Sequence, residues 1–321
     1  MTDLPSPTSG DEFRETPVPG GAGDTVGAGG AGDTAGAAGR SAGGDGGVVA
    51  GLWGASHPGP TVAVTVLSLV LGVAIGLPVA RLLEVGFAVF TGQLSIGWSN
   101  DWLDARRDAQ VGRTDKPTAT GAVRPETVRT AFIVAVVAVI PLSLLLGAAA
   151  AVAHLVLVAS GLAYNLGLKK TALSWLPFAV SFGLLPVVVT LAAAPPGLAR
   201  WWVVAAGALL GVAAHFANVL PDLDDDRATG VRGLPHRLGR VASGLFAFGA
   251  LLVAAALATF GAGRMPEAVP LVAFALDVLI AACGVWLVLT RPPARLLFRL
   301  IIASALLAVL SLALSGSSLI A

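Results

Sequence analysis

The sequence predicts an all-α integral membrane protein, built as a bundle of nine transmembrane helices with an internal repeat. Of its 321 residues, 55% are hydrophobic and 12% are charged, whereas a soluble domain carries about 25% charged residues. Long apolar stretches alternate with short polar ones, and one acidic pattern occurs twice. The formal net charge of +1 argues against a nucleic-acid partner, and the single cysteine, Cys283, excludes a disulfide framework within one chain.

The first 50 residues differ in composition from the remainder of the chain. They are rich in glycine and alanine with scattered aspartates, and hold few large apolar side chains. Such a segment cannot bury enough surface to offset the entropy of ordering, so we expect a disordered tail. Its acidic start and the absence of a basic region before an apolar run are not typical of a signal peptide. We therefore divide the chain into a tail, residues 1–56, and a helical domain, residues 57–321.

The helical domain contains apolar stretches of the length that crosses a bilayer, which is about 20 residues. The nine predicted spans are 61–80, 84–103, 128–147, 149–166, 172–193, 201–220, 241–262, 267–290 and 297–317. The third and fourth are separated only around Gly147, without a charged loop.

The distribution of basic residues predicts the orientation of these spans. Most of the 20 Lys and Arg residues lie in the loops after spans two, four, six and eight. The positive-inside rule places these loops in the cytoplasm. We expect an integral plasma-membrane protein with a cytoplasmic N-terminus and an outside C-terminus. The acidic patterns then close spans two and six on the cytoplasmic side.

The acidic pattern consists of an asparagine and two aspartates, each four residues after the previous one. It occurs in SNDWLDARRD, residues 99–108, and in ANVLPDLDDD, residues 217–226. Residues spaced by four share one face of a helix. The first set is Asn100, Asp104 and Asp108, and the second is Asn218, Asp222 and Asp226.

Clustered carboxylates at a membrane-embedded helix end call for cations. These side chains offer oxygen ligands, which suit Mg²⁺ and, as a second choice, Mn²⁺. Mg²⁺ is commonly shared between carboxylates and phosphate oxygens. Two such sets facing each other would hold several Mg²⁺ ions and a diphosphate.

Further short motifs accompany the two acidic ones. NDWLDARRD, residues 100–108, fits an NDxxDxxxD pattern, and the loop after it contains Lys116-Pro117 and Arg124-Pro125. YNLGLKK follows the fourth span at residues 164–170. The second acidic motif is followed by Thr229-Gly230 and by LPHRLG at residues 234–239. In this order and spacing, over about residues 60–318, the chain resembles the UbiA superfamily of intramembrane prenyltransferases.

The resemblance implies a helical bundle with a central cavity that opens to lipid. It also implies Mg²⁺-dependent transfer of an isoprenyl group from a prenyl diphosphate to a lipophilic, commonly aromatic acceptor, with release of diphosphate. Carried over residue by residue, it implies metal ligation by Asn100, Asp104, Asp108, Asn218, Asp222 and Asp226. The four aspartates and Tyr164 would be catalytic. Substrate binding would fall to Lys169, Lys170, Arg113, Lys116, Arg237 and Asn165.

The acceptor stays open at this point. Family members with benzoate-type acceptors tend to have basic residues at the start of the first helix, where this chain offers only His57. This weakens 4-hydroxybenzoate and leaves naphthoates, other phenols, a sugar or glycerol phosphate, or a specialised metabolite.

Two alternatives to a prenyltransferase remain. The first is an intramembrane terpene cyclase on the same scaffold. The second is a divalent-cation transporter, although both acidic sets are predicted at one membrane face, and transporter sites tend to lie near the midplane.

Overall fold

The computed structural model describes residues 45–223, 230–290 and 295–321, and these residues form helices joined by turns. An isolated bridge joins Ala199 to Ile320. The helices are α1 (Asp45–Ala55), α2 (Pro58–Ala74), α3 (Val79–Gln110), α4 (Pro125–Leu145), α5 (Ala148–Leu166), α6 (Leu176–Leu191), α7 (Trp201–Val219), α9 (Leu234–Phe260), α10 (Ala268–Thr290) and α11 (Arg295–Leu314). The all-α prediction is thus confirmed for the described part of the chain.

Most of the long helices have the length and apolarity needed to cross a bilayer. Among the described residues these are α3, α4, α5, α7, α9 and α10, and α1 with α2 passes the same test as a pair bent by 68°. Helix α6 and the part of α11 from Arg299 are apolar but shorter. Nine spans therefore stays a prediction, although each predicted span overlaps one of these helices.

Two helix boundaries differ from the predicted spans, and one agrees. Helix α3 continues beyond residue 103 to Gln110, because the polar residues of the acidic motif prolong it past the apolar stretch. Helix α6 begins at Leu176, because residues 168–170 form a short 3₁₀ helix, η1, before it. The predicted break at Gly147 is confirmed. Its φ of 96° lies in a region that glycine adopts readily.

Helix α1 corrects the predicted extent of the disordered tail, which included residues 45–55. Its residues pack in a small cluster formed by Leu52 and Ala55 with Val123, Val128 and the two tryptophans Trp98 and Trp102. The indole N–H of Trp98 also donates to the Leu52 carbonyl at 2.8 Å. Small residues in GVVAGLWGA allow this contact. The first 44 residues lie outside the described part of the chain.

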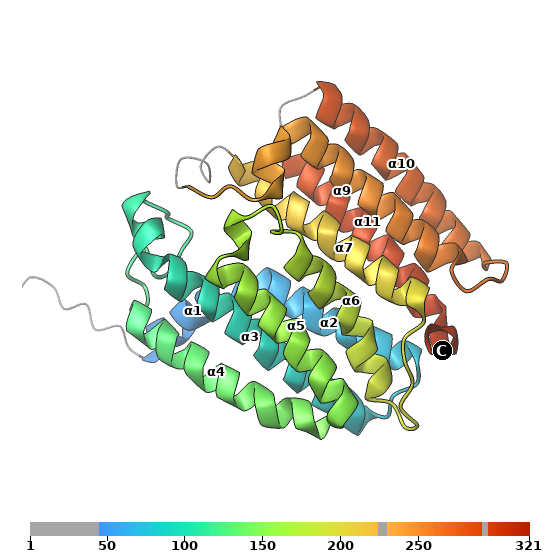
Figure 1. Ribbon diagram of the computed structural model, residues 1–321, viewed down its shortest axis with the longest axis horizontal. Helices are drawn as coiled ribbons and strands as arrows, with labels where there is room; N and C mark the ends of the chain where they lie inside the picture. Colours follow the sequence, from blue (N-terminus) through green and yellow to red (C-terminus); the bar gives the residue numbers. More distant parts are fainter. Residues whose placement is uncertain (1–44, 224–229, 291–294) are drawn as a thin grey trace, which may run out of the picture. The chain divides into compact units, whose positions relative to one another are not determined.

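The described helices form one bundle with a continuous apolar core. In Figure 1, helices α2–α6 lie side by side, and α7, α9, α10 and α11 form the neighbouring group. The seam between the groups is close packed: a Cβ added at Gly207 or Gly211 of α7 would collide with backbone carbonyls of α6. Small residues four apart on a helix are a common means of bringing membrane helices together.

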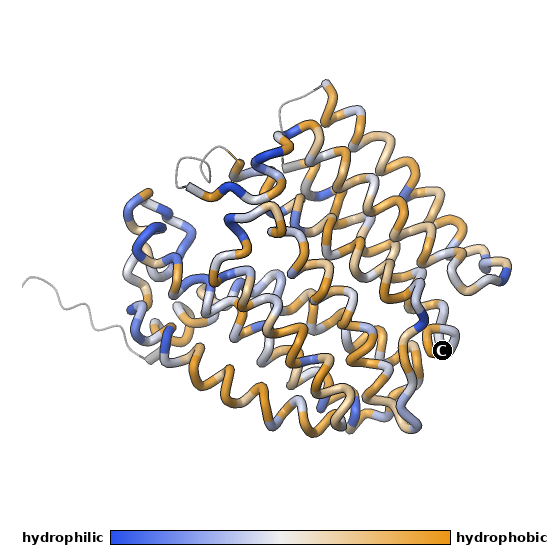
Figure 2. The backbone as a smooth tube through the Cα atoms, in the orientation of Figure 1, coloured by the Kyte–Doolittle hydropathy of each residue, from blue (hydrophilic) through white to orange (hydrophobic). Residues whose placement is uncertain are grey.

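Polar residues gather at one end of the bundle. Figure 2 shows apolar residues along most of the length of the helices, and hydrophilic residues in the loops after α3 and α5 and before α9. The end of α3 that carries the acidic motif lies in this region. We refer to it as the polar end.

The packing of α1 predicts different effects for two deletions. Removal of residues 2–44 should leave activity and thermal stability unchanged, as expected for a tail without a packed core. Removal of residues 2–55 also removes Leu52 and its neighbours from the cluster with Val123. Full burial of a leucine side chain contributes about 1.5–3 kcal/mol, and Leu52 is half-buried, so we expect a modestly lower unfolding temperature in detergent. Equal unfolding temperatures for the two deletions would contradict a packing role for α1.

Candidate active site at the polar end

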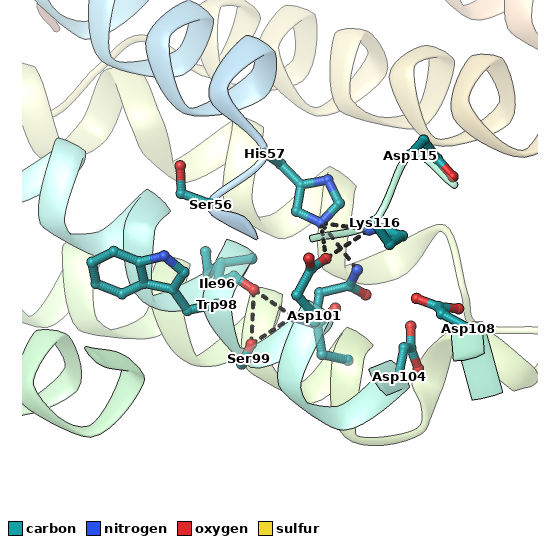
Figure 3. Close-up of polar contacts among 12 residues, drawn as sticks. Ser56, His57, Ile96, Trp98, Ser99, Asp101, Asp104, Asp108, Asp115 and Lys116 are labelled. Carbon is teal, nitrogen blue, oxygen red and sulfur yellow. Dashed lines mark hydrogen bonds and ion pairs between the residues drawn. The ribbon is translucent and has the colours of Figure 1, made fainter. Parts of the chain in front are cut away.

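The last turns of α3 place the first acidic set on one buried face. Asp104 and Asp108 lie next to each other in Figure 3, with residue exposures of only 8% and 2%. Asn100 lies one turn earlier and is half-buried. The i, i+4 spacing therefore produces the shared face that the sequence predicts.

Two cations neutralise these carboxylates. Lys169, in η1, donates to both oxygens of Asp104, at 2.8 Å to Oδ1 and 2.6 Å to Oδ2. Arg107 donates to Asp104 Oδ2 at 3.1 Å and to Asp108 Oδ1 at 3.3 Å. Burial lowers the pKa of Lys169 from its ordinary value, and the Asp104 carboxylate opposes that shift. A buried lysine with two short carboxylate contacts ties the α5–α6 loop to α3.

One carboxylate oxygen of the Asp104–Asp108 pair has no neutralising partner. Asp108 Oδ2 is buried and has no hydrogen-bond partner among the described residues. An unpaired buried carboxylate oxygen is costly. It therefore marks the place where a further cation would be favourable.

Asp101 points to a different cluster. Its side chain is fully buried, and its Oδ1 lies 2.6 Å from Lys116 Nζ and 2.9 Å from His57 Nε2. Asn100 Nδ2 lies 3.2 Å from the same histidine nitrogen. Figure 3 shows this cluster beside the Asp104–Asp108 pair rather than within it. Lys116, predicted to bind substrate, is thus paired with Asp101 here.

His57 connects this cluster to the break between α1 and α2. It has a φ of 56°, in the left-handed region that residues other than glycine rarely adopt. Its contacts with Asp101 and Lys116 stabilise this turn, which joins two helices bent by 68°. The sequence marked His57 only as a basic residue near the first helix.

Three other predicted substrate-binding residues lie at the surface or close to it. Arg113 forms two 2.8 Å bonds to Asp115 and holds the pKa of that carboxyl at about 2. Lys170 and Arg237 are exposed. In this structure none of the three contacts Asp104 or Asp108 through an ion pair that the described residues show.

Asn165 has a bridging position between two helices. Its amide nitrogen donates to the Ile96 carbonyl at 2.8 Å and to Ser99 Oγ at 2.7 Å. Both acceptors belong to α3, so Asn165 fixes the end of α5 against the helix that carries Asn100.

The second acidic set is described only in part. Asn218 is exposed in the last turn of α7. Asp222 lies in a short 3₁₀ helix, η2 (Leu220–Asp222), but its side chain and the whole of Asp226 lie outside the described residues. The facing arrangement of the two sets therefore stays a prediction.

The segment after the second set packs against the loop that holds Lys169. Ser174 is fully buried; it accepts a hydrogen bond from the Leu234 amide at 2.9 Å and lies 3.0 Å from His215 Nε2. A Cβ at Gly233 would come within 2.8 Å of the Lys169 carbonyl. Residues far apart in sequence thus meet beside Asp104.

An aromatic cluster and a small cavity lie on the membrane side of these residues. Tyr164 is edge-on to Phe178, with ring centroids 5.1 Å apart, and 5.8 Å from the His215 ring. Both Tyr164 and Phe178 line a cavity of about 90 Å³. Its other lining residues are Val64, Gln93, Ile96, Leu157, Gly161, Pro177, Ser181, Phe182 and Leu185.

The donor set fits a hard divalent cation. Asp104, Asp108 and Asn100 supply oxygen atoms on one face, as Mg²⁺ prefers, and Asp108 Oδ2 lacks a partner. Within the described residues, no group of three His, Cys, Asp or Glu side chains forms a metal site. The side chains of Asp222 and Asp226 are outside that search.

Residues 60–304 match the sequence profile of the UbiA prenyltransferase family. The chain belongs to this family. The resemblance drawn from the motifs is thereby confirmed, and with its apolar helices the chain is an integral membrane protein. A comparison with curated proteins finds no match.

Solved structures show the same UbiA-type fold at low identity. A structure of digeranylgeranylglyceryl phosphate synthase has a TM-score of 0.64 and 15% identity, covering 84% of this chain and 98% of its own. A UbiA homologue from Archaeoglobus fulgidus bound to GPP and Mg²⁺ has a TM-score of 0.62 and 13% identity, with 82% and 99% covered. The apo homologue from Aeropyrum pernix K1 has a TM-score of 0.59 and 19% identity, with 82% and 98% covered.

Sequence reasoning missed two features of this UbiA-family site. Arg107 was not singled out, although its place three residues after Asp104 in the same helix is the signal that could have identified it. Ser174 and Gly233 carry no motif of their own. Their role arises from a tertiary contact that no local spacing indicates.

Proposed function

We propose that this UbiA-family protein is a Mg²⁺-dependent prenyltransferase. It would transfer an isoprenyl group from a prenyl diphosphate to a lipophilic, aromatic acceptor within the membrane. The observation that carries the proposal is the buried Asp104–Asp108 pair, with Lys169 beside it. An apolar cavity lined by Tyr164 and Ile96 begins about two helical turns before Asp104 along α3. Relatives of the same fold bind GPP or DMAPP together with Mg²⁺.

The proposed metal ligands are Asn100, Asp104 and Asp108 from α3, with Asn218, Asp222 and Asp226 from the second set. Mg²⁺, or Mn²⁺ in its place, would neutralise the diphosphate as a leaving group. Mg²⁺ binds bare carboxylates weakly because it retains its water ligands. The diphosphate oxygens would therefore complete the same site.

Protein side chains would bind the diphosphate and exclude water from the reacting carbon. Lys169 and Arg107 lie within reach of Asp104, so a diphosphate at this carboxylate would meet two fixed positive charges. Lys170, Arg113, Lys116, Arg237 and Asn165 stay second-choice substrate contacts, given their partners and exposure in this structure. The apolar cavity would keep water from the allylic carbon as its bond to oxygen breaks.

The proposed reaction balances as a substitution. The bond between the prenyl carbon and the diphosphate oxygen breaks, and the electron pair leaves with diphosphate. The acceptor donates an electron pair to form the new bond and then releases a proton. Tyr164 and Phe178 present rings that would stabilise positive charge at the carbon during transfer. We propose a plasma-membrane location, with the polar end on the cytoplasmic side.

Prenyl diphosphate and Mg²⁺ should bind cooperatively, because each supplies ligands or charge that the other needs. Linkage requires that each tighten the other by the same factor. The measurement is equilibrium binding of geranyl diphosphate to the purified protein across a Mg²⁺ titration, with EDTA as the zero point. Equal affinity with and without Mg²⁺ would rule out the shared site.

A terpene cyclase is the second candidate, because three aromatic rings, from Tyr164, Phe178 and Phe182, line the cavity. Such rings stabilise a carbocation during cyclisation as well as during transfer. Incubation with geranylgeranyl diphosphate and Mg²⁺ but without an acceptor separates the two activities. A cyclic product under these conditions supports the cyclase, whereas a transferase leaves the substrate unchanged until an acceptor is added.

A further inference from the structure

A buried pair, His215 and Ser174, lies close to the loop residue that contacts Asp104. His215 is 1% exposed in α7, and Ser174 is fully buried in the loop between α5 and α6. His215 Nε2 lies 3.0 Å from Ser174 Oγ, whereas Nδ1 is buried and has no hydrogen-bond partner among the described residues. Within that part of the chain, Ser174 therefore supplies the hydrogen bond of this imidazole.

Ser174 connects His215 to the segment that precedes α9. Its hydroxyl accepts a hydrogen bond from the Leu234 amide at 2.9 Å, and its own proton remains available to donate. His215 Nε2 is the acceptor within reach. A Cβ added at Gly233 would come within 2.8 Å of both Ser174 Oγ and the Lys169 carbonyl. The backbone at Gly233 is thus packed against the hydroxyl and the lysine together, so the position of one constrains the other.

The backbone between Lys169 and Ser174 consists of consecutive turns. The amides of Lys170, Thr171 and Ser174 each donate to the carbonyl three residues earlier. Displacement of Ser174 would therefore also displace Lys169. Lys169 Nζ lies 2.8 and 2.6 Å from the two oxygens of Asp104, and hydrogen bonds weaken as their length and angle depart from the optimum. A small shift of this loop is enough to change the contacts of the lysine.

The imidazole of His215 is held in place by aromatic rings. Its ring centroid lies 5.0 Å from that of Phe178, 5.8 Å from Tyr164 and 5.6 Å from Phe216. One turn earlier in α7, a Cβ at Gly211 would collide with the Phe178 carbonyl of α6. The histidine therefore gives the α5–α6 loop a fixed attachment to the helix bundle.

We propose that His215 is a positioning residue: through its hydrogen bond to Ser174, it holds the α5–α6 loop in the conformation that directs Lys169 to the diphosphate. This inference rests on the proposed prenyltransferase function. His215 would contact neither the metal nor the diphosphate. Its contribution would pass through Lys169, so loss of the hydrogen bond should weaken diphosphate binding only while Lys169 is present.

The affinity for geranyl diphosphate at saturating Mg²⁺, measured on the full-length protein in detergent, tests this inference in two backgrounds. His215→Leu removes the hydrogen bond and should weaken binding by about tenfold, as is common when a group that orients a ligating residue is lost. In Lys169→Met, the same substitution should have no further effect, because the residue that it positions is gone. An equal loss in both backgrounds, or wild-type affinity in the first, would overturn the proposal.

His154 offers a matched control, because it is a second buried histidine with a serine partner. It is fully buried in α5, and its Nδ1 lies 2.7 Å from Ser143 Oγ. It precedes the end of α5 at Leu166 by about 18 Å along the helix. His154→Leu should lower the unfolding temperature but leave the affinity for geranyl diphosphate unchanged. A loss of affinity equal to that in His215→Leu would show that any loosening of the bundle weakens the site, and the proposal would fail.

Two further variants test the hydrogen bond itself. His215→Gln places an amide near the position of Nε2 and should retain most of the affinity. Ser174→Ala removes the bond from the loop side and should match His215→Leu; it also serves as the test in both backgrounds if the leucine variant does not fold. A glutamine variant as weak as the leucine variant, or an alanine variant with wild-type affinity, would refute the role of the bond.

The wild-type protein in the same measurement separates this inference from the proposed function. Geranyl diphosphate should bind to it in a Mg²⁺-dependent manner. Absence of such binding would refute the prenyltransferase function itself, whereas Mg²⁺-dependent binding that is insensitive to His215→Leu and Ser174→Ala would refute only the positioning role.

Discussion

Replacement of Asp104 by asparagine should lower prenyl transfer by more than about 100-fold, the scale on which a positioned charge-stabilising group contributes to catalysis. The change keeps the size of the side chain but removes the negative charge that would bind Mg²⁺. It also leaves Lys169 buried without its carboxylate partner. Breaking a buried ion pair in this way costs about 3–5 kcal/mol. We therefore expect a lower unfolding temperature together with the loss of activity.

A double variant separates these two effects. In Asp104→Asn, Lys169→Met the unpaired lysine is removed as well, so thermal stability should recover while activity stays lost. The measurements are turnover of geranyl diphosphate at saturating Mg²⁺ and the unfolding temperature in detergent. Activity near the wild-type level in either variant would refute the assignment of Asp104 as a metal ligand.

Replacement of Lys169 by methionine should have opposite effects on the two ligands of the site. Without prenyl diphosphate, Lys169 occupies both oxygens of Asp104 and so competes with Mg²⁺. Its removal should raise Mg²⁺ affinity by about tenfold, within the usual range of coupling between two ligands. Affinity for prenyl diphosphate should fall, because the diphosphate loses a positive charge.

Isothermal titration with Mg²⁺ alone, and then with geranyl diphosphate at saturating Mg²⁺, measures both effects. Lys170→Met is the matched control, because Lys170 is the adjacent residue and is exposed. It should leave Mg²⁺ affinity close to that of the wild-type protein, because Asp104 pairs with Lys169 and Arg107; its effect on diphosphate affinity tests its place among the second-choice substrate contacts. A Lys169→Met variant that binds Mg²⁺ more weakly than wild type would show that the lysine supports the metal site instead of competing for it.

The helices of the bundle could be predicted because a bilayer imposes length and apolarity on each span. Even the short break at Gly147 was visible, since glycine allows the positive φ found there. Helix α1 was missed because its residues are mostly small. Its stability comes from Val123 and Trp98, which are distant in sequence, so composition alone pointed to disorder.

The site could be predicted to the extent that it depends on one helix. Asn100, Asp104 and Asp108 share a face because their spacing matches the helical repeat. The partners of the charges depend on loops. Lys116 was expected near the diphosphate but pairs with Asp101, because the loop after α3 folds back over α1. Lys169 contacts Asp104, a pairing that the sequence did not predict, and its binding of a diphosphate stays a prediction.

Gly233 packs closely against the Lys169 carbonyl, so the loop before α9 and the loop between α5 and α6 are in direct contact at the polar end. Movement of one loop must displace the other, because Ser174 also joins them through the Leu234 amide. Gly230 and Arg232 of the outer loop are exposed. An antibody fragment or cyclic peptide that binds residues 230–232 would therefore pull on Lys169 without entering the cavity. A ligand at this surface would act on Lys169 through these loop contacts and would not compete with a lipophilic substrate.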